Sequence, residues 1–256
     1  MTNAPAKTRT LARVTGKDAQ TFLQGLLTNS IAPLATAPGL VWTAVLSPQG
    51  KYLADFFVVN TGDALLLDLP GSLADDLLKR LTMYKLRADV QITPAPDLHV
   101  SRGHGPQPAG AHPDPRHPAL GWRSYGPTPQ TEPATDWDAL RVTHLIPETM
   151  IELIPNDSYI LEWGFERLHG VDFRKGCYVG QEVTARMKHK TELRKGMARV
   201  TISHPVPVGT EITAEGKPVG QIFTQSGGQA IAYLRYDRAN DAMTAGDATV
   251  AYLGQD

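Results

Sequence analysis

Apolar and polar positions near the N-terminus predict a strand followed by a helix. The apolar residues at 11–14 form a short strand signal that ends at Thr15 and Gly16. Beyond it, apolar residues recur at i, i+3, i+4, i+7 and i+8, which is one face of an amphipathic helix: Ala19, Phe22, Leu23, Leu26 and Leu27. Asp18 stands at the start of this helix, where a carboxylate complements the helix dipole.

Further strand signals and a second helix follow. Strands are predicted at 41–47 and 52–59, joined by a turn at 48–51, and at 64–69. Ser72 is expected to cap a helix, a strand at 88–93 follows it, and the helix has an apolar stripe of Leu73, Leu77, Leu78, Leu81 and Tyr84. This order of elements predicts an α+β fold, in which an antiparallel sheet carries helices on one face.

The segment from Pro94 to Pro133 holds much of the proline and four histidines. One histidine belongs to a short strand signal at 98–101, and the others lie in Gly/Pro-rich sequence that cannot form long helices or strands. Their spacing lacks the pairing typical of zinc ligands, so no metal site is predicted and 103–118 is expected to be an exposed excursion. After it, Thr135 is expected to cap a helix that carries Trp137.

The last part of the chain changes to short strands at regular spacing. They are separated by Gly/Pro/Asp turns and predict a small β-barrel, with strands at 197–202, 211–214, 218–225, 229–234 and 248–252. With the boundaries suggested by these patterns, the chain is expected to comprise three units: 1–94, 95–192 and 193–256.

Composition limits the classes of function. The formal net charge of -1 over 256 residues argues against a nucleic-acid binder driven mainly by backbone electrostatics. The single cysteine fits a reducing compartment and excludes both an intrachain disulfide and an iron–sulfur cluster held by this chain's thiolates alone. No segment has the apolar length of a membrane span, so we expect a cytoplasmic protein without a membrane partner.

That cysteine, Cys177, is the principal candidate for chemistry. It lies between Gly176 and Gly180, close in sequence to Arg174, Lys175 and Arg186, and ahead of a segment with helical periodicity. A helix N-terminus and neighbouring cations both favour thiolate over thiol, which is the reactive form. The alternative is that the thiol is a small buried apolar group, since free cysteines are among the most buried residues.

The string around the cysteine is specific. Residues 175–182, Lys-Gly-Cys-Tyr-Val-Gly-Gln-Glu, resemble the K-G-C-Y-x-G-Q-E signature of the YgfZ family, whose folate-binding members are related to the aminomethyltransferase (GcvT) of the glycine cleavage system. The stretch Arg13 to Asn29 is similar to the opening of that family, and Trp137 to Val142 is similar to its W-x-x-x-R-I segment. The resemblance implies a GcvT-like N-terminal region of ferredoxin-like units, tetrahydrofolate as the cofactor, and a role linked to iron–sulfur cluster assembly and tRNA modification.

The same resemblance suggests roles for individual residues. Asp55 matches the aspartate that faces the folate nitrogen in the related transferases, although Ala54 stands where those enzymes usually have a second aspartate. Trp137 and Glu182, with Asp55, are candidates for the platform and the edge of the pterin ring. Arg186 or Lys188 is a candidate partner for the anionic tail, and Lys175 is a further cofactor-binding candidate. From the sequence pattern alone, Asp55 could equally be an outward, solvated carboxylate and Trp137 a core residue.

A run of basic residues follows the signature: Arg186, Lys188, His189, Lys190, Arg194 and Lys195. It is either a solvated helix end or a place for an anion, such as a polyglutamate tail or, as a weak contact, RNA phosphate. Three functions therefore stay open. The protein is a folate-binding factor that works with iron–sulfur assembly or client proteins through Cys177, a tetrahydrofolate-dependent aminomethyl- or methyltransferase that uses Asp55, or a scaffold with a vestigial folate cleft.

Overall fold

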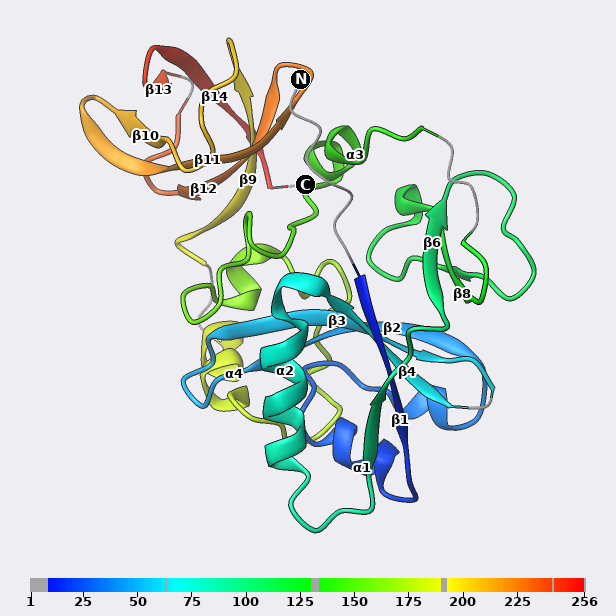
Figure 1. The fold of residues 1–256 in the computed structure, drawn as a ribbon. Helices are drawn as coiled ribbons and strands as arrows, with labels where there is room; N and C mark the ends of the chain where they lie inside the picture. Colours follow the sequence, from blue (N-terminus) through cyan, green and yellow to red (C-terminus); the bar gives the residue numbers. More distant parts are fainter. Residues whose placement is uncertain (1–8, 63, 130–133, 190–192, 241, 256) are drawn as a thin grey trace. The chain divides into compact units, whose positions relative to one another are not determined.

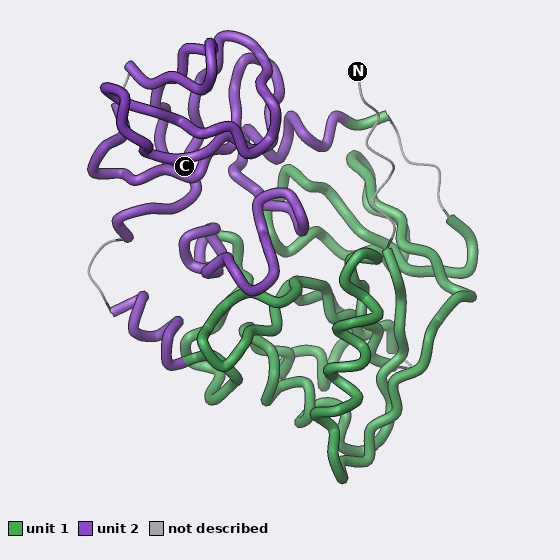
Figure 2. Tube along the Cα trace, turned by 60° about the vertical axis from the view of Figure 1, so that its left-hand side comes forward, with its two compact units in different colours: residues 1–135, 168–181 green, residues 136–167, 182–256 purple. Residues whose placement is uncertain are grey.

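The computed structural model describes residues 9–62, 64–129, 134–189, 193–240 and 242–255. The chain forms two compact units, one of residues 1–135 and 168–181 and one of residues 136–167 and 182–256 (Figure 2). Each unit thus combines separate stretches of sequence. The three consecutive units expected from the sequence are a different division, and they stay a prediction.

The first unit contains a five-stranded antiparallel sheet in the order β2-β3-β4-β1-β5 (Figure 1). Its strands are β1 (Arg9–Thr15), β2 (Gly39–Leu46), β3 (Tyr52–Asn60), β4 (Leu65–Pro70) and β5 (Gln91–Pro94). The sequence predicts the bounds of each of these strands to within a few residues, because turns with Gly, Pro and Asp bound the apolar runs. The turn at 48–51 joins β2 and β3, with Gly50 at the left-handed φ of 74° that such turns require.

Two helices cover one face of this sheet (Figure 1). The first, α1 (Ala19–Gln24), is shorter than expected, and Leu27 beyond it is bridged to Val45 of the sheet. The second, α2 (Gly71–Tyr84), buries Ala74, Leu77 and Leu81 against the strands. Ser72 is not its cap, because α2 begins directly after Pro70, whose fixed φ already suits the approach to a helix.

The opposite face is covered by a three-stranded sheet in the order β6-β8-β7. Its strands are β6 (His99–Gly103), β7 (His112–Pro113) and β8 (Trp122–Gly126), with a 3-10 helix, η2 (Pro118–Leu120), before β8. The expectation that 103–118 is an exposed excursion is wrong for much of this segment. Ala111 and Asp114 are buried. Asp114 pairs with Arg116 and also lies 3.7 Å from Arg123, which in turn pairs with Asp68 of the large sheet.

The second unit contains the closed barrel, in the order β10-β11-β12-β9-β14-β13. Its strands are β9 (Lys195–Ile202), β10 (Glu211–Ala214), β11 (Lys217–Ser226), β12 (Gln229–Arg235), β13 (Met243–Ala245) and β14 (Ala248–Gly254). Only the three-residue β13 was not foreseen, since three residues are too few to show a period. The predicted small β-barrel is confirmed.

Short helices complete the molecule: η1 (Ala32–Ala35), α3 (Trp137–His144), η3 (Ile160–Trp163) and α4 (Gln181–His189). Asp136 caps α3, and its side chain accepts a hydrogen bond from the Ala139 N–H at 2.9 Å, so the cap is one residue later than the Thr135 expected. The α+β fold class is confirmed. Within the described residues, no helix has both the length and the apolar character needed to cross a bilayer.

Candidate functional site

Cys177 lies in the loop that leads into α4, and it is exposed. The next residue, Tyr178, is 8% exposed and anchors the loop in the first unit. The prediction that the thiol stands at a turn entering a helix is confirmed, and the alternative of a buried apolar cysteine is excluded. The sulfur is therefore open to a partner molecule.

The start of the loop is tied to the segment after α1. The Thr28 hydroxyl donates to the Gly170 carbonyl at 2.7 Å, and the Asn29 amide donates to the His169 carbonyl at 2.7 Å. The backbone N–H of Asp172 in turn donates to the Thr28 carbonyl at 3.0 Å. These bonds join residues about 140 positions apart in the chain, so the loop depends on the folded first unit.

Lys175 holds the middle of the loop. Its ammonium donates to the carbonyl of Gln24, the last residue of α1, at 2.6 Å, and lies 4.9 Å from the centre of the Tyr178 ring. A cation at a helix C-terminus and over an aromatic face is favourable in both positions. Burial lowers the pKa of Lys175, an effect that the charges of Asp172 and Cys177 oppose. Lys175 thus ties the loop of Cys177 to the end of α1.

Two glycines shape the end of the loop for different reasons. Gly180 has φ 84°, and a Cβ there would come within 2.5 Å of the Ser47 carbonyl oxygen, so the backbone needs to pass close to the β2–β3 turn. Gly176 has φ 96° but open space around it, so only its conformation calls for glycine. The Gln181 side chain then accepts a hydrogen bond from the Tyr178 N–H at 3.1 Å, which closes the turn into α4. The signature is a set of positioning residues around one exposed sulfur.

Asp55 is buried, not solvated. One carboxyl oxygen accepts a hydrogen bond from the indole N–H of Trp42 at 2.8 Å and the other accepts from the Tyr52 hydroxyl at 2.7 Å. The interpretation of Asp55 as an outward, solvated carboxylate is therefore wrong. Trp42 was not foreseen as its partner, although the hairpin register gives the signal: Ala44 is paired with Asp55 and Trp42 with Phe57, so Trp42 and Asp55 share one face.

The other predicted residues lie on the helices. Trp137 is half-buried at the start of α3, and on α4 Glu182 is exposed in the first turn and Arg186 in the last. Lys188 pairs with Glu166, and Lys190 lies outside the described residues. The structure thus brings Lys175 to Cys177 and Trp42 to Asp55. Among the described residues, no group of three or more His, Cys, Asp or Glu side chains is arranged to hold a metal ion.

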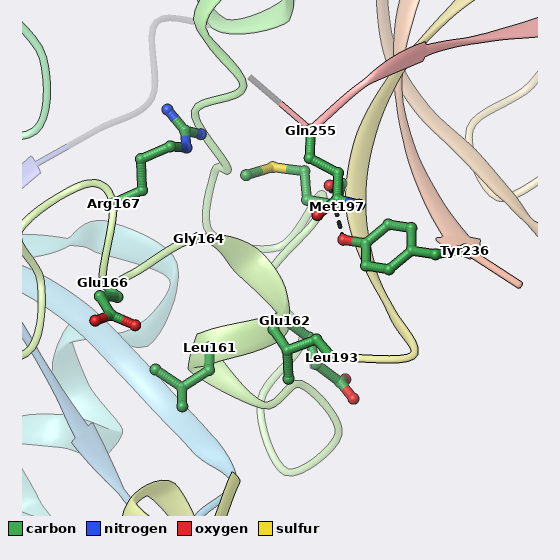
Figure 3. A pocket seen from close by; sticks show the side chains of 9 residues that line it. All are labelled: Leu161, Glu162, Gly164, Glu166, Arg167, Leu193, Met197, Tyr236 and Gln255. Carbon is green, nitrogen blue, oxygen red and sulfur yellow. Dashed lines mark hydrogen bonds between the residues drawn. The ribbon is translucent and has the colours of Figure 1, made fainter. Parts of the chain in front are cut away.

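A cavity of about 310 Å³ opens in the second unit (Figure 3). Glu162, Arg167 and Met197 are among its lining residues, and the Tyr236 hydroxyl donates to the Met197 carbonyl at 3.1 Å across it. None of the predicted site residues lines this cavity. It therefore gives no support to any of the three functions considered.

Comparison with known proteins gives consistent results. Residues 194–253 match the model of the CAF17 C-terminal beta-barrel domain. The chain is 31% identical to the mitochondrial iron-sulfur cluster assembly factor IBA57 of Mus musculus over 89% of its own length and 75% of the relative's. It is 32% identical to the IBA57 protein of Homo sapiens over 88% and 75% of the two lengths. In fold it is similar to the glycine cleavage system aminomethyltransferase T of Bartonella henselae, with a TM-score of 0.71 at 10% identity, covering 96% of this chain and 83% of that one.

These comparisons correct two expectations. The relatives are named IBA57 and not YgfZ. The resemblance to the YgfZ family is therefore confirmed only for the wider group of related proteins, and the family of this chain is that of IBA57. They are also named as mitochondrial proteins, which contradicts the cytoplasmic setting expected from the sequence. A single cysteine and a near-neutral charge are equally compatible with any reducing compartment, so composition could not distinguish the two.

Proposed function

Because this chain belongs to the family of IBA57 iron–sulfur cluster assembly factors, we propose that it takes part in assembling these clusters through the thiol of Cys177. One observation carries the proposal: Cys177 is exposed on a loop that is fixed at its start, middle and end. A fixed, exposed sulfur is a soft ligand that iron in a cluster can bind without reorganisation of the protein.

The chemistry is ligand addition. The Sγ atom of Cys177 gives up its proton to solvent and donates a lone pair to an iron of the cluster, and no electron is transferred. The chain has only one cysteine, whereas a cluster usually needs about four ligands, so the remaining ligands come from a partner protein or a small thiol. The cluster is therefore cargo that is shared and passed on, and the partners are iron–sulfur assembly or client proteins.

The test compares the wild-type chain with Cys177→Ala in cells that lack the native protein, with the activities of iron–sulfur enzymes as the readout. The variant should lose those activities while the amount of folded protein stays unchanged, because the side chain is exposed. A matched control is Val208→Ala, which truncates an exposed side chain in the barrel unit. Normal cluster enzymes in the Cys177→Ala cells would refute the role of the thiol.

An in vitro arm removes the dependence on cellular partners. The purified chain is incubated with ferrous iron, sulfide and glutathione, and cluster formation is followed by visible absorption and circular dichroism. Wild type should yield a protein-bound cluster chromophore and Cys177→Ala should yield none. A chromophore that persists in the variant would mean that the cluster is held elsewhere on the protein.

Tetrahydrofolate binding is the second part of the proposal, and Asp55 supports it. The carboxyl group is held in a fixed position by two donors, the indole N–H of Trp42 and the hydroxyl of Tyr52. Lys175 fits folate less well, because its ammonium already serves Gln24 and Tyr178. When bound, the folate would supply a one-carbon carrier. Trp137, Glu182 and Arg186 belong to the second unit, and folate contacts by these residues stay predictions from the sequence.

A tetrahydrofolate-dependent transferase is the alternative function, with Asp55 as the acid or base. Isothermal titration with tetrahydrofolate, comparing wild type, Asp55→Asn and Trp137→Ala, tests the binding part, and equal affinities for all three would remove these residues from the site. Loss of a folate-dependent transfer in Asp55→Asn, with iron–sulfur enzymes unaffected, would favour the transferase. Loss of the cluster enzymes in Cys177→Ala alone would favour the assembly role.

A further inference from the structure

The end of α2 carries the two large apolar side chains that are most exposed among the described residues. Leu86 is 87% exposed and Met83 is 65% exposed, three positions apart in the chain. Met83 also lines a groove of about 600 Å³ between α2 and β5, whose apolar walls include Leu78, Ile92 and Pro94. Single exposed apolar residues are ordinary, but a pair next to an apolar groove is typical of a binding surface.

Leu86 is held outward by its backbone. Its φ of 46° lies in the left-handed region, which is unfavourable for a leucine and is usually occupied by glycine or asparagine. The surrounding loop is ordered by hydrogen bonds: the Lys85 ammonium donates to the Val90 carbonyl at 3.0 Å, and the Asp89 N–H donates to the Asp18 carboxyl group at 2.8 Å. The exposed leucine is thus a fixed feature of the fold and not a frayed end.

The charge around this end of the helix is positive. Residues 77–88 contain no Asp or Glu, whereas the whole chain has a net charge of -1. The acidic residues of this part of the chain are Asp75 and Asp76, both earlier on α2, with Asp18 and Asp89, and the cations are Lys17, Lys79, Arg80, Lys85 and Arg87. Arg80 and Lys85 are half-buried, and their charged groups donate to the Tyr84 hydroxyl and the Val90 carbonyl. Lys79 and Arg87 are therefore the exposed cations within 77–88.

We propose that the loop after α2 docks on an anionic lipid surface. Leu86 and Met83 enter the acyl region, and Lys79 and Arg87, both exposed, meet headgroup phosphates. Among possible occupants, a lipid surface fits best because it accepts protruding apolar side chains flanked by cations without a shaped partner. The docking is peripheral. It departs from the expectation of no membrane partner and does not depend on Cys177.

The test is flotation of the full chain with vesicles of phosphatidylcholine alone or of phosphatidylcholine mixed with phosphatidylglycerol. Wild type should bind the anionic vesicles, and binding should weaken as NaCl is raised. Leu86→Asn removes the apolar side chain but tolerates the left-handed backbone, so the variant should stay folded and lose about tenfold or more in vesicle affinity. Arg87→Gln should show a smaller loss that disappears at high salt.

Val208→Asn is the matched control, since it makes the same kind of change at a side chain that is 58% exposed in the barrel unit. It should leave vesicle binding unchanged, and thermal melting should show all variants folded. Equal binding to neutral and anionic vesicles, competition by inorganic phosphate at constant ionic strength, or unchanged binding by Leu86→Asn would each overturn the proposal. Failure of wild type to bind any vesicle would do the same.

Discussion

The two faces of the five-stranded sheet are built from different chemistry. On one face, Phe56, Val58 and Leu67 pack against α1 and α2 in an apolar core. On the other, Trp42, Phe57 and Asp68 follow one another across β2, β3 and β4 in register. Both faces are buried, and both are formed by the same strands with side chains alternating between them.

The polar face is organised around Asp68, which has no solvent exposure. Its carboxyl oxygens pair with Arg9 at 2.6 Å and with Arg123 at 2.7 Å, and they accept a hydrogen bond from Tyr125 at 2.9 Å. The Arg123 guanidinium lies 4.1 Å from the centre of the Phe57 ring. The apolar face needs only residues of suitable volume, whereas the polar face needs every partner in place. The face that carries Asp55 is thus the more demanding one.

The largest effect is expected from Asp68→Asn. The amide keeps the shape but removes the charge that faces the buried Arg123 and the half-buried Arg9, which should lower the free energy of unfolding by about 3–5 kcal/mol. Urea unfolding measures this value. The matched control is the neighbouring Leu67→Ala on the apolar face of the same strand, with an expected loss of about 2–5 kcal/mol from the cavity.

The double variant Asp68→Leu with Arg123→Met tests whether the polar face could be replaced by apolar side chains like those of the other face. If the polar face is only structural, apolar replacement of the pair should recover much of the lost stability, as buried ion pairs often allow. Arg9 would still need solvent, and its side chain is 19% exposed, so it can reach water. A cost below about 1 kcal/mol for Asp68→Asn would contradict the importance given to the network.

Local patterns predicted the elements of both units but not the polar layer. The barrel strands, the β2–β3 hairpin and α2 follow from periodicity and turn residues, which act over a few positions. The pairing of Asp68 with Arg123 joins residues 55 positions apart, and no local pattern encodes such a contact. The prediction for 103–118 was wrong for the same reason. Proline and glycine content does not indicate whether a segment is exposed, and this segment is held by the ion pairs of Asp114 with Arg116 and Arg123.

The candidate site divides in the same way. The loop at Cys177 could be predicted, because the glycines, the cation and the following helical period all lie within a few residues of the thiol. That Lys175 binds the end of α1 could not be predicted, since Gln24 is 151 positions away. Trp42 was within reach of sequence reasoning, because the turn at 48–51 fixes the register that sets it on the face of Asp55.

A smaller effect is expected from Trp42→Phe on the polar face. The change removes one donor from the buried Asp55 while keeping an aromatic ring, so the free energy of unfolding should fall by about 1–2 kcal/mol. Tyr52→Phe removes the other donor and is the matched variant. A double-mutant cycle of Trp42→Phe with Asp55→Ala should give a coupling of about 1 kcal/mol or more, and additive losses would show that the two side chains act independently.

The smallest expected effect is the pH dependence of stability that the carboxyl groups of the polar face cause. Burial alone would raise the pKa of Asp68 and of Asp114, but the neighbouring arginines outweigh burial and hold both pKa values below the usual 3.8. A carboxyl group with a lowered pKa in the folded state stabilises the protein fully above its unfolded pKa and loses that contribution as the pH falls toward the folded pKa. Stability should therefore stay level above about pH 5 and decline below about pH 4, by at most about 1.4 kcal/mol per pH unit for each group.

Asp114→Asn tests the origin of this acid limb. The variant should be less stable at neutral pH and should show a shallower decline in acid, because residue 114 no longer takes up a proton on unfolding. Asp97→Asn is the control: Arg13 lowers the pKa of Asp97 to about 2, but both side chains are in solvent, which screens their attraction. An acid limb that follows Asp97 and ignores Asp114 would place the pH dependence at the surface and contradict the role given to the buried carboxyl groups.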